Sequence, residues 1–90
     1  MKTGLYSIYD KKAKFYSRPF TAQNDEVAIR TIANSFKDPQ SQQTEYVVNS
    51  EDFLLHRLGY MDDSNGELIP EMEALIDLQS LKPAEIGRAS

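Results

Sequence analysis

The stretch from Asp52 to Pro70 constrains the fold of this chain most strongly, because it has the pattern of a β-hairpin. Residues 53–61 are dense in apolar and aromatic side chains, and residues 67–69 return after the polar run Asp-Asp-Ser-Asn-Gly. A loop of this length usually holds a type I turn closed by a residue at positive φ, which Gly66 adopts without a Cβ penalty. Pro70 has no N–H to donate and is predicted to end the returning strand. Since a two-stranded ribbon is marginal in water, other elements must cover its apolar face.

The first twenty residues predict a second hairpin, with a basic tip. Residues 4–10 are rich in β-forming side chains, residues 11–14 make a polar connection, and residues 15–20 are expected to pair back as the second strand. Pro19 marks the end of that strand or an edge position, because it cannot donate to a ladder.

A helix is predicted from about residue 25 to residue 36. Asn24 is a good N-cap, and Asp25 and Glu26 place negative charge at the positive end of the helix dipole. Apolar side chains then recur at helical spacing, at Ala28, Ile29, Ile32, Ala33 and Phe36. We therefore expect an α+β fold, in which this helix lies across an antiparallel sheet of about four strands made by the two hairpins.

The rest of the chain gives weaker patterns. Residues 46–48 are predicted to be a short extended piece, and residues 49–52 a turn or a single helical turn. Residues 71–78 are amphipathic and predict a possible short C-terminal helix. We thus expect a single domain over residues 1–70 and a C-terminal segment, 71–90, that is partly helical or frayed.

Composition limits the class of protein. A chain of 90 residues makes one domain at most and buries only about two-thirds of its unfolded surface. It has no cysteine, which excludes disulfides and thiolate chemistry, and no apolar run long enough for a signal peptide or a membrane span. A soluble, cytosolic protein is expected.

The net charge of −4 hides an asymmetry along the chain. Residues 1–37 hold seven basic and three acidic groups, or +4, whereas residues 38–90 hold three basic and eleven acidic groups, or −8. This distribution suits either an anionic partner at one end or head-to-tail self-association.

The residue types that catalysis requires are missing. His56 is the only histidine and has no cysteine or second histidine with which to form a zinc site or a nucleophilic triad. The carboxylates of Asp62, Asp63 and Glu67 lack the spacing of a calcium-binding EF-hand loop and fit a solvated turn. We therefore expect no enzymatic activity, no metal and no cofactor.

The first hairpin combines cations with aromatic rings, as single-stranded nucleic acid requires, because cations follow the phosphates while rings stack on bases. If Phe15 faces the helix, Tyr16 and Arg18 face solvent and can stack and pair with phosphate. Alternatively, the aromatic rings are core and the lysines are simply solvated. The candidate DNA-binding residues here are Lys11, Lys12, Lys14, Tyr16 and Arg18.

Several short motifs occur in a characteristic order: Leu-Tyr-Ser-Ile-Tyr-Asp-Lys-Lys (5–12), Arg-Pro-Phe (18–20), Asn-Asp (24–25), Ala-Ile-Arg (28–30), Glu-Asp-Phe (51–53), Arg-Leu-Gly (57–59) and Asp-Asp followed by Asn-Gly. Over about residues 4–70 the chain resembles the small nonstructural proteins of gokushoviruses, which are single-stranded-DNA phages of the Microviridae. The resemblance implies a protein made in the host cytoplasm that acts with the phage genome in replication or packaging. It implies no catalytic residue. The matching positions that can meet DNA are Lys11, Lys12, Arg18 and Arg30.

Two functions follow from these observations. The first is a non-enzymatic single-stranded-DNA-binding protein that uses the hairpin of residues 6–20. The second is a protein-interaction module whose acidic half docks on capsid, scaffold or replication proteins, or on the basic half of another copy. A homodimer or higher homo-oligomer is expected, since an uncovered sheet edge offers unpaired N–H and C=O groups.

Overall fold

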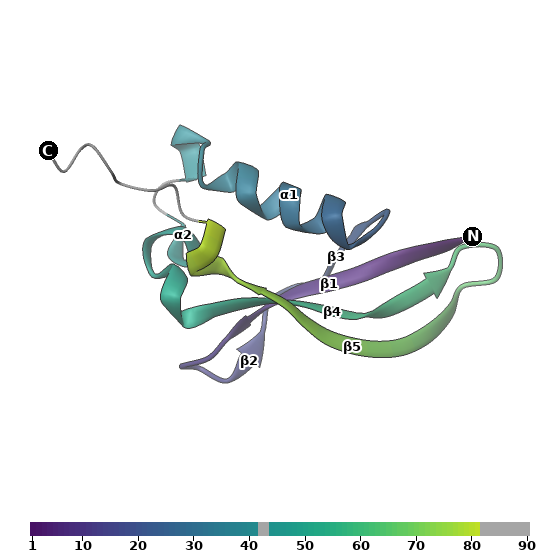
Figure 1. Cartoon of the computed structure of the whole chain (residues 1–90). Coiled ribbons are helices and arrows are strands. Elements are labelled where there is room, and N and C mark those ends of the chain that lie inside the picture. Colours follow the sequence, from purple (N-terminus) through teal and green to yellow (C-terminus); the bar gives the residue numbers. More distant parts are fainter. Residues whose placement is uncertain (42–43, 82–90) are drawn as a thin grey trace, which may run out of the picture.

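Over residues 1–41 and 44–81, which the computed structural model describes, the chain forms a five-stranded antiparallel sheet with a helix across one face (Figure 1). The strands are β1 (Lys2–Asp10), β2 (Phe15–Tyr16), β3 (Phe20–Ala22), β4 (Phe53–Asp62) and β5 (Glu67–Asp77). The helices are α1 (Asp25–Ser35) and the short α2 (Glu45–Val48), with 3₁₀ turns at Pro39–Ser41, Ser50–Asp52 and Leu78–Leu81. The predicted α+β class is confirmed, as is the helix lying across a sheet built from two hairpins.

β1 is the strand that joins the two hairpins. It pairs with β4 along its whole length, from Lys2 opposite Asp62 to Asp10 opposite Phe53. On its other edge it pairs with β3 near its start and with β2 at its end, so the strand expected over residues 15–20 is present but divided. The division falls at Ser17–Pro19, because Pro19 has no N–H for the ladder.

The turn between β4 and β5 has the expected geometry. Gly66 has a φ of 76°, and its N–H donates to the carbonyl oxygen of Asp62 at 2.7 Å. The Asp62 carboxylate accepts from the hydroxyl of Ser64 at 2.6 Å and from its backbone N–H at 3.0 Å. These hydrogen bonds hold the pKa of Asp62 below its usual value.

β5 continues past Pro70 to Asp77, so the predicted strand end at Pro70 and the predicted helix over residues 71–78 are both wrong. Proline is tolerated there because β5 lies at the edge of the sheet and the β4–β5 register shifts close to it. A second shift leaves Leu75 as an extra residue between Ala74 and Ile76. This bulge turns neighbouring apolar residues to one side and imitates the spacing of a helix. The domain boundary proposed at residue 70 falls within β5.

Residues 46–48, predicted to be extended, form part of α2 instead. The β-branched pair Val47-Val48 favours a strand, but burial of Val47 in the core overrides that local preference. The helical turn expected over residues 49–52 is present as the 3₁₀ turn Ser50–Asp52. The fraying expected at the end of the chain lies, from residue 82 on, outside the described residues.

The core fills the space between α1 and the sheet. As predicted, α1 is capped by Asn24, whose side-chain oxygen accepts from the N–H of Val27 at 2.9 Å. Alternate residues of β1 and β4 face the helix, since Ile8 stands opposite Leu55 in the ladder. The buried apolar residues are Tyr6, Ile8, Ala28, Ile32, Phe36, Val47, Phe53, Leu55 and Leu78. No helix within the described ranges is long and apolar enough to cross a membrane.

Gly59 is predicted to be the most sensitive backbone position of the sheet. It has a φ of 154°, both ladders of β4 shift register beside it, and a Cβ added there would collide with the carbonyl oxygen of Ile69. Gly59→Ala should lower the free energy of unfolding in urea by about 2–4 kcal/mol. Gly66→Ala is the matched control and should lose only about 1 kcal/mol, because the space around Gly66 is open. Equal losses would contradict the collision at Gly59.

Candidate nucleic-acid interface

The β1–β2 turn holds three of the predicted DNA-binding residues. Asp10 shapes the turn, since its carboxylate accepts from the N–H groups of Lys12 and Ala13 at 2.9 and 3.0 Å. Its carbonyl oxygen accepts from the N–H of Lys14 at 2.7 Å. Lys14 has a φ of 60°, a conformation that normally favours glycine or asparagine. Lys14 therefore adopts the left-handed conformation of this exposed turn, and its contact with the turn is made by its backbone N–H.

Two of these lysines form ion pairs at the surface. Lys11 Nζ lies 3.6 Å from Asp77 Oδ2, and Lys12 Nζ lies 3.6 Å from Asp52 Oδ2. Exposed pairs of this kind contribute about 0–1 kcal/mol, so the lysines can exchange these carboxylates for phosphates at little cost. Within the described part of the chain, no ion pair involves Lys14 or Arg18.

The aromatic and basic residues after the turn are divided between the two faces of the sheet. The sequence predicts that Tyr16 and Arg18 share a face, but the interruption at Pro19 separates them. Phe15 and Arg18 line a cavity on the side of α1, together with Ile32. Tyr16 lies on the opposite face, where its ring centroid is 4.7 Å from that of Tyr9. Of the two aromatic residues, Phe15 is the more exposed, at 60%.

Arg30 is separated from the other predicted DNA-binding residues. It lies on the exposed side of α1, whose buried side holds Ala28 and Ile32. Figure 1 shows α1 above the sheet and the β1–β2 turn below it, at the left-hand end. The structure thus gathers Lys11, Lys12 and Lys14 at one turn and places Arg30 elsewhere.

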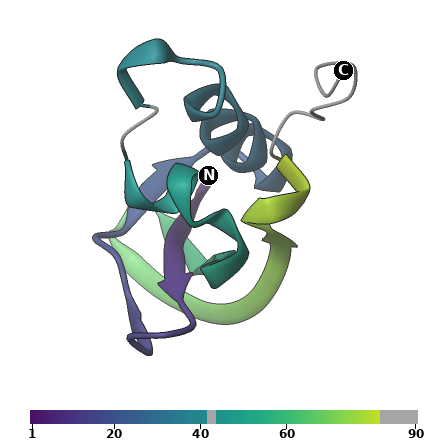
Figure 2. The same ribbon diagram turned by 90° about the vertical axis from the view of Figure 1, so that its left-hand side faces the viewer.

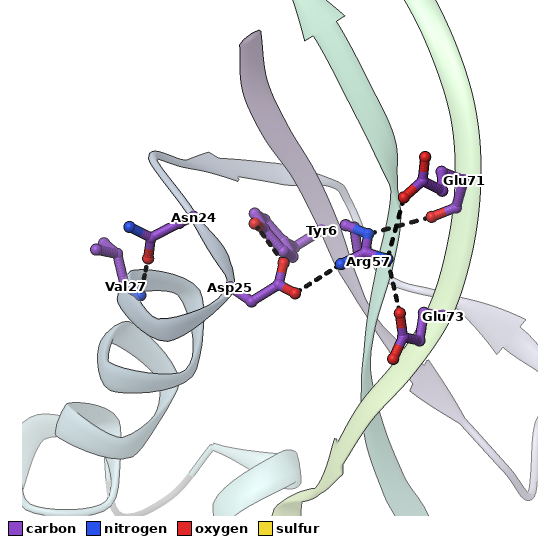
Figure 3. A network of polar contacts seen from close by, with 7 residues as sticks. All are labelled: Tyr6, Asn24, Asp25, Val27, Arg57, Glu71 and Glu73. Carbon is purple, nitrogen blue, oxygen red and sulfur yellow. Dashed lines mark hydrogen bonds and ion pairs between the residues drawn. The ribbon is translucent and has the colours of Figure 1, made fainter.

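Sequence reasoning missed a buried charge at the centre of the sheet. The side chain of Arg57 is only 8% exposed, and its guanidinium contacts Asp25 at 2.6 Å and Glu73 at 2.7 Å (Figure 3). It also lies 3.6 Å from the Glu71 carboxylate and donates to the Glu71 carbonyl oxygen at 3.2 Å. Tyr6 Oη donates to the other oxygen of Asp25 at 2.9 Å. We refer to Tyr6, Asp25, Arg57, Glu71 and Glu73 as the Arg57 network.

The Arg57 network joins four elements, β1, α1, β4 and β5, and it has the character of a structural bond. Burial alone would lower the pKa of Arg57, but the hydrogen bond to Glu73 and the charge of Asp25 outweigh it and raise that pKa. Burial and the Asp25 carboxylate raise the pKa of Tyr6. A signal was available in the sequence, because Arg57 follows Phe53 and Leu55 at the period of two that faces the core. A cation at such a position needs acidic partners.

The opposite face of the sheet carries an aromatic cluster formed by Tyr9, Tyr16 and His56. The Tyr9 and His56 rings are stacked at 5.6 Å, and Tyr16 Oη lies 3.1 Å from His56 Nδ1. His56 Nε2 is buried and has no hydrogen-bond partner among the described residues. Burial lowers the pKa of His56 below its usual value of 6.5. Tyr16 thus contacts Tyr9 and His56 on this face while remaining 38% exposed.

The match to a known family covers most of the chain. Residues 3–81 match the family described as Phage ORF5 protein. The chain belongs to this family. No curated protein and no solved structure matches it. The family match shows that this is a phage protein, as the resemblance implied. Separately, the described residues contain no group of three or more histidines or carboxylates arranged to hold a metal ion.

Removing Arg57 is predicted to destabilise this phage protein more than removing any one of its acidic partners. Arg57→Met leaves Asp25 and Glu73 without their cation, but both carboxylates reach water, so we expect a loss of about 1–3 kcal/mol in urea unfolding. Glu73, at 61% exposed, is the control, and Glu73→Gln should lose less than about 1 kcal/mol. If Glu73→Gln were the more damaging change, Arg57 would not be the centre of the network.

Stability is predicted to fall in mild acid because of His56. A histidine whose folded-state pKa lies below 6.5 binds its proton more readily when the chain is unfolded. Neutral, buried His56 therefore imposes no penalty on folding above pH 6.5. Below pH 6.5 the unfolded chain gains a proton that folded His56 resists, so stability falls until the pH drops below the folded-state pKa. The free energy of unfolding should decline from neutral pH to about pH 5, before most carboxylates protonate. His56→Gln should flatten this decline, and an unchanged pH profile in that variant would contradict the assignment.

Proposed function

We propose that this phage protein is a non-enzymatic single-stranded-DNA-binding protein of the gokushovirus type. In this proposal it acts in the host cytoplasm during genome replication or packaging. The observation that carries the proposal is the β1–β2 turn, where three exposed lysines within four residues directly precede Phe15. Proteins that bind single-stranded DNA use cations that follow the phosphate backbone. They also use exposed aromatic rings on which the bases stack.

The geometry of the turn supports this function in two ways. The ion pairs of Lys11 and Lys12 are long and exposed, so phosphate can replace their carboxylates. The positive φ of Lys14 costs conformational energy, and such positions are retained more readily where the side chain serves a function. Arg18 adds a further cation beside Phe15, since both line one cavity. Arg30, on the far side of α1, is not part of the proposed surface.

The distribution of charge favours contact at the β1–β2 turn, even though Asp52 and Asp77 pair with two of its lysines. The carboxylates of Glu67, Glu71 and Glu73 lie along β5, and those of Asp62 and Asp63 lie at the β4–β5 turn. DNA is repelled by such a surface and is steered to the basic turn at the opposite end of β1. An acidic protein can bind DNA in this way, although its net charge is −4.

A protein-interaction module is the second candidate, supported by the outer edge of β5. β5 ends the sheet, and it exposes Leu68 and Met72 beside its glutamates. This edge suits a basic, partly apolar segment of another phage protein or the basic half of a second copy. Pro70 and the register shifts of β5 interrupt regular strand pairing there, so contact through side chains is favoured over added strands.

The proposal predicts salt-dependent binding of labelled single-stranded DNA, measured by fluorescence anisotropy. Each phosphate contact should contribute about −0.7 to the slope of log K against log salt. The double variant Lys12→Glu with Lys14→Glu removes two contacts, so the slope should become shallower by about 1.4. Affinity at low salt should also fall by at least about tenfold.

A matched control has the same change in net charge at other sites. Lys2→Glu with Arg30→Glu reverses two exposed cations, one at the start of β1 and one on α1, and should leave affinity and slope nearly unchanged. If both double variants weaken binding equally, the contact is non-specific attraction to net charge. If the unaltered protein shows no binding at low salt, the proposed function is wrong.

A further inference from the structure

A cavity of about 410 Å³ opens beside the basic turn, on the face of the sheet that α1 covers. Its aromatic lining comes from three separate parts of the chain: Phe15 and Phe20 at the divided strand, Tyr46 on α2, and Phe53 at the start of β4. Figure 2 looks onto this end of the molecule, with α1 above the sheet and β5 curving below it. The volume lies within the range of pockets that hold small organic groups.

The aromatic lining includes one fixed ring and one exposed ring. Tyr46 Oη donates to Ser35 Oγ at 3.1 Å, which ties that ring to α1. Phe15 is the ring at the solvent side, directly after the lysines of the turn. A flat, apolar group that enters the cavity could stack on Phe15 or Tyr46. Its charged substituents would then remain in solvent at the mouth of the cavity.

The polar lining supplies both kinds of hydrogen-bonding group. Arg18 donates only and the carboxylate of Glu45 accepts only, whereas the carboxylate of Asp10 already accepts two backbone N–H groups of the turn. A nucleobase has donors and acceptors side by side on its edge, and an exocyclic amino group is the donor that a carboxylate reads best. An aliphatic side chain of a protein partner would make no hydrogen bond with Arg18 or Glu45, which are both exposed at the cavity.

We propose that this cavity binds one unpaired nucleobase and that it prefers bases with an exocyclic amino group, such as cytosine and adenine, over thymine. Thymine offers a single N–H between two carbonyl oxygens and has no amino group to donate to the carboxylate of Glu45. The inference rests on the proposed function, because the lysines of the turn hold the phosphates on either side of the inserted base. It goes beyond that function by assigning a base-binding site and a preference.

The test compares single-stranded oligonucleotides of equal length that carry only cytosine, only adenine, only thymine, or no bases at all. The abasic strand keeps every phosphate and lacks the stacking group. We expect the protein to bind the cytosine and adenine strands more tightly than the thymine strand, and the abasic strand most weakly. Phe15→Ala should weaken binding of the cytosine strand by about 5- to 150-fold, the loss typical for one base-stacking ring, and should leave the abasic strand nearly unaffected.

Two further variants make the result specific to the cavity. Leu68→Ala is the matched control, since Leu68 is 63% exposed and lies at the opposite end of the sheet, and it should bind like the unaltered protein. Glu45→Gln retains the shape of the cavity but removes a charge, and it should narrow the preference for cytosine over thymine. The urea unfolding of each variant shows whether its fold is intact.

The possible outcomes separate this inference from the proposed function. If the abasic strand binds as tightly as the others and with the same salt slope, the lysine turn binds DNA but the cavity holds no base. If no strand binds, both proposals are wrong. If the cytosine strand binds without shifting the ring resonances of Phe15 and Tyr46, the cavity belongs to another ligand, such as an apolar protein segment, and the inference is overturned.

Discussion

The ion pair between Arg57 and Asp25 is the contact on which the arrangement of this protein depends. Asp25 is the first residue of α1, and Arg57 lies in the middle of the sheet, so their 2.6 Å contact fixes the start of the helix over one point of β4. A guanidinium that is 8% exposed is costly to bury unless its donors are satisfied, and here Glu71 and Glu73 of the edge strand complete the set. Hydrogen bonds are more directional than apolar packing, and Asp25 accepts one from Arg57 and another from Tyr6. The network therefore specifies where α1 lies, beyond any net stability it adds.

β1 connects the Arg57 network, in the middle of the sheet, to the β1–β2 turn, where we propose that DNA binds. Tyr6, in the middle of β1, belongs to the Arg57 network, and the strand then leads to Asp10, which shapes the basic turn. Three lysines lie at the β1–β2 turn and several carboxylates lie along β5, but the two groups meet where Lys11 pairs with Asp77 at the end of β5 and Lys12 pairs with Asp52. In the proposed function, the carboxylates along β5 would repel a polyanion while the lysines of the turn attract it.

Local patterns in the sequence were sufficient for the elements whose geometry is local. The hairpin at Asp52–Pro70, its closure at Gly66, the helix and its Asn24 cap were all predicted, because each depends on a few neighbouring residues. The errors arose where contacts between distant residues determine the local structure. Residues 46–48 have a strand-like sequence but form part of α2, where Val47 is buried. Residues 71–78 have apolar residues at helical spacing, but β5 accommodates them with a bulge at Leu75. The same holds at the candidate site. The lysines of the turn were found from sequence, but the separation of Tyr16 from Arg18 depends on how the chain leaves the ladder at Pro19, and the Arg57 network depends on residues 32 positions apart.

The register of β1 against β4 also bears on the order in which the chain folds. Each hairpin pairs residues that are close in sequence, whereas the pairing of Asp10 with Phe53 must close a loop that contains all of α1 and α2. Closing that loop costs chain entropy before its contacts form, so the two hairpins and α1 are expected to form first and the β1–β4 seam last. Because the core packs on this seam, neither half of the chain holds a complete core by itself. A chain shortened before β4 could therefore form the first hairpin and α1 but would lack Phe53 and Leu55, and with them the sheet partner on which the core is completed.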